Sequence, residues 1–301
     1  MRAQEQVLLK LNKLTKNFGG LKAVDVFDLD VASGSITSLI GPNGAGKTTV
    51  FNLITGIYRP EAGSIKFDGR ELIGRQPHQV AKAGIARTFQ TLRLFENLTC
   101  FENVLSGQHC RTCSGIMSSI LGTSAQRREE AEVRGEAERC LKLVDMWDFR
   151  DELARNLPYG YRRRLEIARA LATRPHLLVL DEPAGGLNEK ESADLMELIQ
   201  GIRDSGITIF LIEHDMQVVM GISDWVAVMD NGGKISEGTP YDVQHDARVI
   251  EAYLGTDNDD DLYSEASQAA GQRDTNVPDN KSYIGNTAGS AGEESEGEDR
   301  T

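Results

Sequence analysis

The segment Gly41–Thr48 constrains the fold of this chain more than any other feature. It reads Gly-Pro-Asn-Gly-Ala-Gly-Lys-Thr, which matches the pattern G-x-x-x-x-G-K-[ST], and it lies between an apolar run at 36–40 and a helix-compatible segment. We call it the P-loop. Its glycines let the backbone curl so that N–H groups point at phosphate oxygens, and the helix N-terminus that follows adds a favourable dipole. The pattern therefore predicts a strand–loop–helix site for the phosphates of a nucleotide.

Two side chains of the P-loop have predicted roles in this site. We expect Lys47 to reach the β- and γ-phosphates and the hydroxyl of Thr48 to bind Mg²⁺. By itself, the P-loop is also compatible with a small-molecule kinase. The predicted nucleotide-binding residues of the segment are Gly41, Pro42, Asn43, Gly44, Ala45, Gly46, Lys47, Thr48 and Thr49.

Two adjacent carboxylates, Asp181 and Glu182, follow a second apolar run at 177–180. In a doubly wound sheet, ligands bind outside the carboxyl ends of the strands, so this pair is expected beside the P-loop. Asp181 suits the Mg²⁺ shell, and Glu182 would face the γ-phosphate and orient or deprotonate the attacking water. The alternative is a charge pattern at a helix N-terminus, which the following Pro183 partly supports. The P-loop favours the metal and base roles.

A third apolar run, at 207–212, ends in Glu213-His214 and places a histidine at the same edge of the sheet. A single histidine carries little information alone. Because this edge needs a partner for the γ-phosphate, we predict that His214 faces it.

Two kinds of hydrophobic pattern predict an α/β fold. Alternating apolar and polar residues at 7–11, 27–31 and 65–67 are typical of antiparallel strands. The three nearly continuous apolar runs described above are typical of parallel strands covered on both faces. Between about 99 and 157 the strand pattern gives way to a charged, helix-favouring stretch that includes 125–144. The predicted fold is a P-loop core with a parallel sheet, an antiparallel β-subdomain and a helical subdomain.

Composition and charge limit the classes of function. The net charge is −13, and −9 of it belongs to residues 256–301, so nothing favours nucleic acid as a partner. This acidic segment has scarcely any large aliphatic residues, which predicts a disordered tail after a domain at 1–255. The tail is either simply solvated or used for an interaction. No apolar run approaches the roughly 20 residues that span a bilayer, and the polar N-terminus does not resemble a signal peptide, so we expect a cytoplasmic protein.

Cys110 and Cys113 have C-x-x-C spacing, which is compatible with half of a metal site or with a redox pair. No second pair completes a tetrahedral site. Free thiols in a reducing compartment are therefore the favoured interpretation.

The segment Leu157–Leu171 resembles the signature motif of the ABC-transporter ATPases. Its apolar positions follow helical spacing, so the preceding residues Leu157, Tyr159 and Gly160 are expected at a helix N-terminus that faces an anion. In isolation the segment is also compatible with an ordinary basic amphipathic helix. The resemblance covers roughly residues 7–255 and is strongest to the branched-chain amino-acid importer ATPases of the LivG type. The stretches that resemble this subgroup are 18–21, 84–90, 159–160, 213–223 and 251–255.

The resemblance implies a role for each matching position. Phe18 would stack on adenine, Gln90 would sense Mg²⁺ and the attacking water, and His214 would contact the γ-phosphate. Family members bind two ATP molecules between two cassettes arranged head to tail, each held by the P-loop of one chain and the signature of the other. The resemblance therefore implies a second cassette, transmembrane permease subunits moved through the Gln90 loop, and an indirect role for a solute-binding protein. It places the chain at the cytoplasmic face of the cell membrane.

The chain departs from the family pattern Leu-Ser-Gly-Gly-Gln, because Pro158, Tyr159 and Tyr161 occupy its second, third and fifth positions. Pro158 offers neither a hydroxyl nor an N–H, so the N–H of Gly160 and the helix dipole are expected to carry more of the γ-phosphate contact. Asn188 likewise replaces the usual Asp in the loop after Glu182. Neither departure changes the predicted functional residues. The predicted catalytic residues are Glu182, His214 and Gln90. The predicted metal ligands are Thr48, Gln90 and Asp181.

The predicted function is ATP hydrolysis coupled to solute import. The resemblance points to branched-chain amino acids as the solute. Related importers of other amino acids, amides or urea stay open, as does a soluble ATPase of the same family that serves another process. The signature, His214 and the Asp181-Glu182 pair argue against the kinase.

Overall fold

The computed structural model describes residues 6–108 and 124–254 of the chain. The predicted acidic tail at 256–301 and the Cys110–Cys113 pair lie outside the described residues. The interpretations of both, and the predicted domain boundary at 255, stay predictions.

The first sheet has four strands in the order β2-β1-β4-β5. All neighbouring pairs are antiparallel, as the alternating pattern predicted. In β1, Leu9 and Leu11 are buried on one face, and an irregularity in the pairing with β2 then brings Leu14 to the buried side. The strands are β1 (Val7–Phe18), β2 (Leu21–Ala32), β4 (Ala62–Phe67) and β5 (Arg70–Glu71).

The second sheet has six strands in the order β10-β9-β3-β8-β7-β6. Strands β6, β7, β8, β3 and β9 are parallel, and β10 pairs antiparallel with β9 at one edge. Every residue of β3, β7 and β8 is buried, which confirms that both faces of these strands are covered. The strands are β3 (Ile36–Ile40), β6 (Ile85–Arg87), β7 (Leu177–Asp181), β8 (Thr208–Ile212), β9 (Trp225–Asp230) and β10 (Gly233–Gly238).

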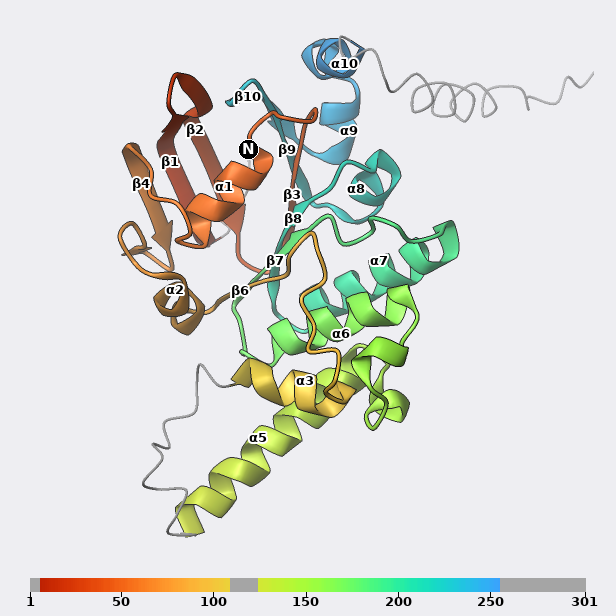
Figure 1. Ribbon diagram of the computed structural model, residues 1–301. Helices are drawn as coiled ribbons and strands as arrows, with labels where there is room; N and C mark the ends of the chain where they lie inside the picture. The colour runs from red at the N-terminus through yellow and green to blue at the C-terminus, as the bar shows by residue number, and fades with distance from the viewer. Residues whose placement is uncertain (1–5, 109–123, 255–301) are drawn as a thin grey trace, which may run out of the picture. The chain divides into compact units, whose positions relative to one another are not determined.

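The helix α1 (Lys47–Ile54) lies between the two sheets (Figure 1). Its residues Val50, Phe51, Leu53 and Ile54 share one hydrophobic cluster with the first sheet and with one face of the second. A second cluster covers the other face of the six-stranded sheet with α3, α5, α6, α7 and α8. The remaining helices are α2 (Pro77–Ala83), α3 (Cys100–Gly107), α5 (Ser124–Leu143), α6 (Tyr159–Leu171), α7 (Glu189–Asp204), α8 (Met216–Ile222), α9 (Pro240–Gln244) and α10 (Ala247–Leu254).

The predicted helical region between 99 and 157 contains α3, α5 and the 3₁₀ turns η2 (Trp147–Phe149) and η3 (Ala154–Asn156). Helices α3, α5 and α6 pack together through buried residues that include Val104, Leu141 and Leu165. Among the helices that the structure describes, none combines the length and hydrophobicity needed to cross a bilayer.

The strand order explains how distant segments meet. Strands β3, β8, β7 and β6 lie side by side and run in the same direction. Their carboxyl ends lead into the P-loop, Glu213-His214, Glu182 and the loop that carries Gln90, respectively. The parallel topology therefore brings all four predicted segments to one edge of the sheet.

Candidate nucleotide site

The P-loop has a backbone that only glycine permits at two positions. Gly41 and Gly46 adopt φ angles of 149° and 106°. A Cβ at Gly41 would lie 1.9 Å from the carbonyl oxygen of Met229 in β9, and one at Gly46 would lie 2.2 Å from that of Ala23 in β2. Because backbone atoms of both sheets close these two sides, the path of the loop is fixed by the fold.

Lys47 is buried and held by the loop that precedes it. Its Nζ donates hydrogen bonds to the carbonyl oxygens of Gly41 (2.5 Å) and Pro42 (2.9 Å). Burial lowers the pKa of Lys47, and the carboxylates of Glu182 and Asp181 oppose this shift. The P-loop lysine therefore lies within electrostatic reach of the two carboxylates, as the sequence predicted.

Asp181 is the last residue of β7, and only 4% of its side chain is exposed. Its Oδ2 pairs with Nη2 of Arg87 at 2.8 Å. Burial raises the pKa of Asp181, and the hydrogen bond and charge of Arg87 oppose this rise. Arg87 had no predicted role, although it lies in the stretch 84–90 that resembles the LivG-type subgroup.

Glu182 is the point at which the three predicted catalytic residues meet. Nε2 of Gln90 donates a hydrogen bond of 2.8 Å to Oε2 of Glu182. Nδ1 of His214 lies 3.8 Å from the other carboxylate oxygen, Oε1. Glu182 has a φ of 46°, and its N–H is held by the carbonyl oxygen of Ile212 at 2.9 Å. The loops after β6, β7 and β8 therefore converge on one carboxylate.

Glu213 connects the loop after β7 to the loop after β8. Its side chain is fully buried; Oε1 accepts from the N–H of Ala184 (2.8 Å) and Oε2 from the N–H of His214 (3.2 Å). Burial raises the pKa of Glu213, and these hydrogen bonds oppose the rise. Glu213 had no predicted role, and these two hydrogen bonds hold the backbone beside both Glu182 and His214.

The signature residues form the first turn of α6 rather than a loop before it. The helix begins at Tyr159, so Tyr159 and Gly160 are its first two residues, and Leu157 is buried. Pro158 is the N-cap and provides no side-chain hydrogen bond. Within the described residues, no hydrogen bond engages the backbone N–H of Tyr159, Gly160 or Tyr161. The turn therefore presents unpaired amides, the feature of a helix N-terminus that binds anions.

Arg163 links this helix to the converging loops, and the sequence analysis missed it. The side chain is fully buried and its Nη1 donates to the carbonyl oxygen of Phe89 and to Oε2 of Glu166, both at 3.0 Å. Its Nη2 lies 3.4 Å from the carbonyl oxygens of Gln90 and Glu182. The available signal was helical spacing, which puts Arg163 and Glu166 on one face of α6 as an ion pair.

Asn188 fills the position where the family pattern has Asp, and it caps α7. Its side-chain oxygen accepts from the N–H of Glu191 at 2.9 Å, and Glu191 Oε2 accepts from the N–H of Asn188 at 3.1 Å. This reciprocal pair is a capping box. Asn and Asp serve about equally well at an N-cap, so the replacement preserves the start of the helix.

Phe18 ends β1 with 43% of its surface exposed. Its ring contacts Tyr58 edge-on, with the ring centroids 5.2 Å apart, and Nζ of Lys16 lies 5.3 Å from the ring centroid. The exposed part of the ring is available for stacking on a base. Its predicted contact with adenine stays a prediction.

The residues present fit a magnesium ion that is bound together with nucleotide phosphates. Mg²⁺ prefers oxygen ligands and is usually held by one or two protein groups, phosphates and waters. Thr48 is an exposed residue in the first turn of α1 and carries a hydroxyl, and Asp181 carries a carboxylate at the end of β7. Gln90 is placed by its hydrogen bond to Glu182. When bound, the ion would supply charge neutralisation on the phosphates.

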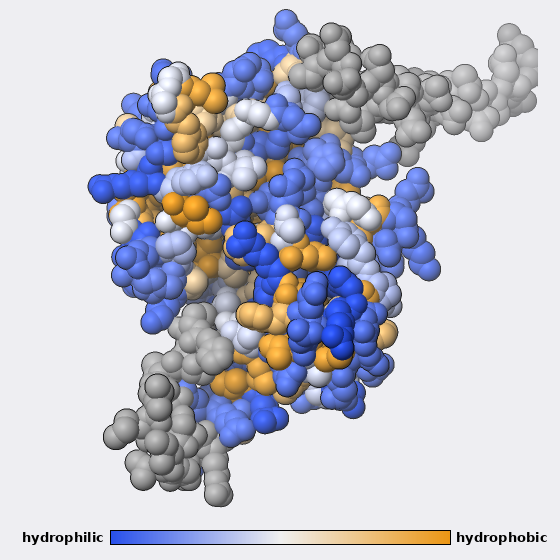
Figure 2. Space-filling model, viewed as in Figure 1, coloured by the Kyte–Doolittle hydropathy of each residue, from blue (hydrophilic) through white to orange (hydrophobic). Residues whose placement is uncertain are grey.

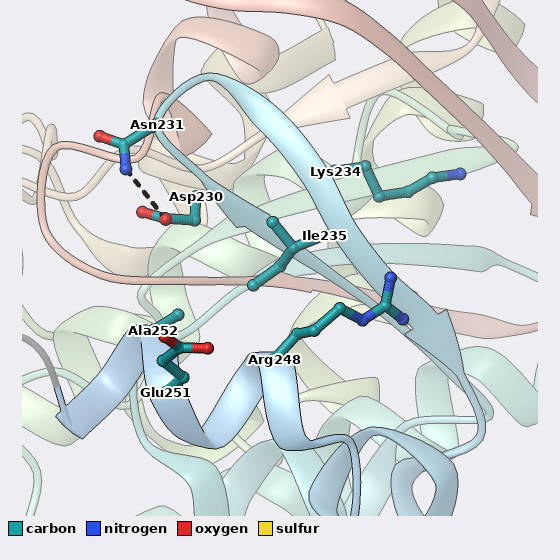
Figure 3. A pocket seen from close by; sticks show the side chains of 7 residues that line it. All are labelled: Asp230, Asn231, Lys234, Ile235, Arg248, Glu251 and Ala252. Atoms are coloured by element: carbon teal, nitrogen blue, oxygen red, sulfur yellow. Dashed lines mark hydrogen bonds between the residues drawn. The ribbon is translucent and has the colours of Figure 1, made fainter.

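A second hollow, of about 720 Å³, lies between the β9–β10 hairpin and α10 (Figure 3). Its two cations are already engaged by acids: Lys234 with Glu237 at 2.8 Å and Arg248 with Asp246 at 2.6 Å. Among the described residues that line this hollow, both cations therefore already have acidic partners.

Comparison with known proteins shows which family the chain belongs to. A family model described as ABC transporter matches residues 24–185, from β2 past Glu182. The chain belongs to the ABC transporter family. It is an ATPase cassette of this family, which confirms the predicted reaction. The alternative function, a small-molecule kinase, is therefore wrong. The solved cassettes described below confirm the predicted fold class. A second model, described as branched-chain amino acid ATP-binding cassette transporter, matches residues 234–259.

Curated relatives align with the cassette over nearly their whole length. The branched-chain amino acid transport ATP-binding protein BraF of Pseudomonas aeruginosa is 46% identical and aligns over 82% of this chain and 98% of its own length. LivG of Salmonella typhimurium is 47% identical over 83% of this chain and 98% of its own. A solved ABC-transporter cassette in its ADP conformation has a TM-score of 0.74 and 32% identity, covering 83% of this chain and 99% of that structure. A nucleotide-free cassette gives a TM-score of 0.72 at 31% identity, covering 82% and 99%.

Proposed function

We propose that the cassette is the ATPase subunit of an importer for branched-chain amino acids. The observation that carries the proposal is the convergence of Lys47, Asp181 and Glu182 at one sheet edge, with Gln90 and His214 in contact with Glu182. The solute is suggested by the names of BraF and LivG, which are branched-chain amino acid transport proteins, and by the second family model.

Each residue at the edge has a step in this reaction. The P-loop amides and Lys47 bind the β- and γ-phosphates, and Thr48, Asp181 and Gln90 would hold Mg²⁺, which would neutralise charge on the phosphates. Glu182 takes a proton from the attacking water, while His214 binds the γ-phosphate beside it. Phe18 stacks on adenine, and the positive N-terminal turn of α6 offers Gly160 to a γ-phosphate. These residues position the attacking water and the γ-phosphate and neutralise the phosphate charge. No covalent bond to the protein forms.

The proposed partner at the nucleotide is a second cassette. The unpaired amides of Tyr159, Gly160 and Tyr161 can bind an anion. In the head-to-tail arrangement of the family, that anion is the γ-phosphate of the nucleotide held by the P-loop of the other cassette. A related cassette, 25% identical with a TM-score of 0.65, was solved as a dimer bound to ADP and phosphate. We therefore infer a homodimer or heterodimer in which each signature completes the partner's site.

The proposed contact with the permease subunits is a groove of about 400 Å³ that borders the segment leading to Gln90. It is lined by α2, β6, α3 and α6, and its rim carries the exposed apolar residues Ile57 and Phe95. Figure 2 shows hydrophobic surface near the middle of this face, where α3 and α6 lie in Figure 1. Docking there would hold the cassette at the cytoplasmic face of the membrane and couple it, through the permease, to a solute-binding protein.

The decisive experiment is Lys47→Ala in the assembled transporter. We expect loss of ATP consumption and of leucine uptake, because the β- and γ-phosphates lose their cationic partner. Lys66→Ala, at an exposed position on β4, is the matched control and should retain both activities. Unchanged ATP consumption in the Lys47 variant would overturn the proposal. Uptake of other amino acids, amides or urea in preference to leucine would keep the ATPase and replace the solute.

A further inference from the structure

Arg87 is buried at the junction of three elements of the nucleotide site. It ends β6, and 9% of its side chain is exposed. Its guanidinium carbon lies 5.7 Å from the ring centroid of Phe51 and 5.2 Å from that of Phe89. Contacts with two aromatic rings restrict the orientation of the guanidinium group.

The two ends of the guanidinium bind different elements. Nη2 pairs with Oδ2 of Asp181 on β7 at 2.8 Å. Nη1 donates to Oδ1 of Asn52 at 2.6 Å and to Oγ1 of Thr55 at 3.3 Å, and both of these residues belong to α1 or its C-cap. Arg87 therefore bridges the strand that ends in Asp181 and the helix that begins at the P-loop.

This bridge joins the two elements that carry the metal ligands of the proposed function. Asn52 lies four residues after Thr48, so it is on the same face of α1 and one turn further along. Within the described residues, Arg87 contacts one carboxylate oxygen of Asp181, and no hydrogen bond or ion pair engages the other, Oδ1. An ion at Oδ1 could therefore bind without breaking the pair between Arg87 and Oδ2 of Asp181.

We propose that Arg87 is a positioning residue for Mg²⁺, which fixes the carboxylate of Asp181 relative to Thr48 through one planar side chain. The inference rests on the proposed function, since it assumes that Asp181 and Thr48 hold the ion. Partners that orient a ligating carboxylate typically change metal affinity roughly 10- to 100-fold when they are removed. If Arg87 instead competed with Mg²⁺ for Asp181, removing Arg87 would lower the Mg²⁺ concentration that nucleotide binding requires.

The test measures Mg²⁺ binding without turnover. A fluorescent non-hydrolysable ATP analogue is bound to the full chain, first in EDTA and then during a Mg²⁺ titration. For Arg87→Met we expect unchanged affinity in EDTA and a Mg²⁺ requirement raised roughly 10- to 100-fold. Arg93→Met is the matched control: Arg93 stacks on the same Phe89 ring, at 4.4 Å, from an exposed position, and we expect its titration to match the wild type.

Two further variants keep the test decisive if Arg87→Met does not fold. Arg87→Lys retains the positive charge but lacks the fork that reaches Asp181 and Asn52 together, and Asn52→Ala removes the anchor on α1. Both should raise the Mg²⁺ requirement while melting cooperatively. A titration equal to that of the wild type, or a lower Mg²⁺ requirement, in any folded variant at Arg87 overturns the inference. Absence of Mg²⁺-dependent nucleotide binding in the wild type would instead overturn the proposed function.

Discussion

Gln90 and Glu182 are joined by a hydrogen bond of 2.8 Å between the Gln90 amide and the Glu182 carboxylate. The bond connects the loop after β6, which borders the apolar groove, to the residue proposed as the general base. Under the proposed function, movement of that loop by a docked permease changes the position of Glu182 directly. ATP hydrolysis and permease docking then share one contact.

Glu182→Gln should bind ATP and dimerise but turn over slowly. Loss of a positioned general base reduces the rate roughly 10²- to 10⁴-fold, while the phosphate-binding groups are unchanged. Phosphate release and size-exclusion chromatography with ATP measure the two properties. Glu197→Gln, at an exposed position on α7, is the control and should behave as the wild type. Near-normal turnover in the Glu182 variant would discard this residue as the base.

Arg163→Met should destabilise the fold strongly. It leaves Glu166 buried without its ion-pair partner, and breaking a buried pair in this way costs about 3–5 kcal/mol. Urea unfolding of the isolated chain measures the change in free energy. The double variant Arg163→Met with Glu166→Leu should recover much of the loss, because no buried charge remains. If the single variant unfolds at the same urea concentration as the wild type, the network around Arg163 does not stabilise the fold.

Asn188→Ala should weaken the start of α7, while Asn188→Asp should not. Loss of the capping hydrogen bond costs roughly 0.5–2 kcal/mol, whereas Asp accepts the same bond from Glu191. Urea unfolding of both variants measures this difference. Equal destabilisation by Ala and Asp would show that the capping bond is not what this position contributes.

Glu213 should make stability fall as the pH rises. Its pKa is higher in the folded chain than in the unfolded chain because burial disfavours the carboxylate, so the folded state binds the extra proton between the two pKa values. The free energy of unfolding therefore decreases as the pH rises from about 4.5, the ordinary value of this carboxyl. Urea unfolding of the wild type and of Glu213→Gln at several pH values isolates this contribution: the stability of the wild type relative to the variant should fall as the pH rises. Identical slopes would contradict the assignment.

The features that local spacing encodes were predictable from the sequence. The P-loop, the Asp181-Glu182 pair and Glu213-His214 each follow an apolar run, and parallel topology brings the ends of such runs to one edge. The helical stretch at 125–144 matches α5 closely, because it is rich in charged helix formers. The family resemblance was confirmed for the same reason, since its motifs are short and contiguous.

The contacts between distant segments were not predictable in the same way. Arg87 and Asp181 are separated by 94 positions, and Arg163 reaches the Phe89 carbonyl across 74. A sequence separation of this size leaves no periodic pattern, and the spacing of Arg163 and Glu166 on α6 indicates an ion pair but not the contact with Phe89. Arg87 and Arg163 are buried because each is paired with a buried acid, Asp181 and Glu166 respectively. The start of α6 was also placed too late, because Tyr159 and Gly160 already belong to the helix.

The close contacts at Gly41 and Gly46 have a consequence for how tightly different cassettes hold nucleotide. Backbone atoms of β9 and β2 lie close to the P-loop on two sides. The P-loop therefore loses most of its conformational freedom when the chain folds, before a nucleotide binds. Substitutions in those strands that shift Met229 or Ala23 by a fraction of an ångström should therefore alter ATP affinity without touching ATP. Tuning of this family's affinity would then be found in the scaffold behind the loop as much as in the loop itself.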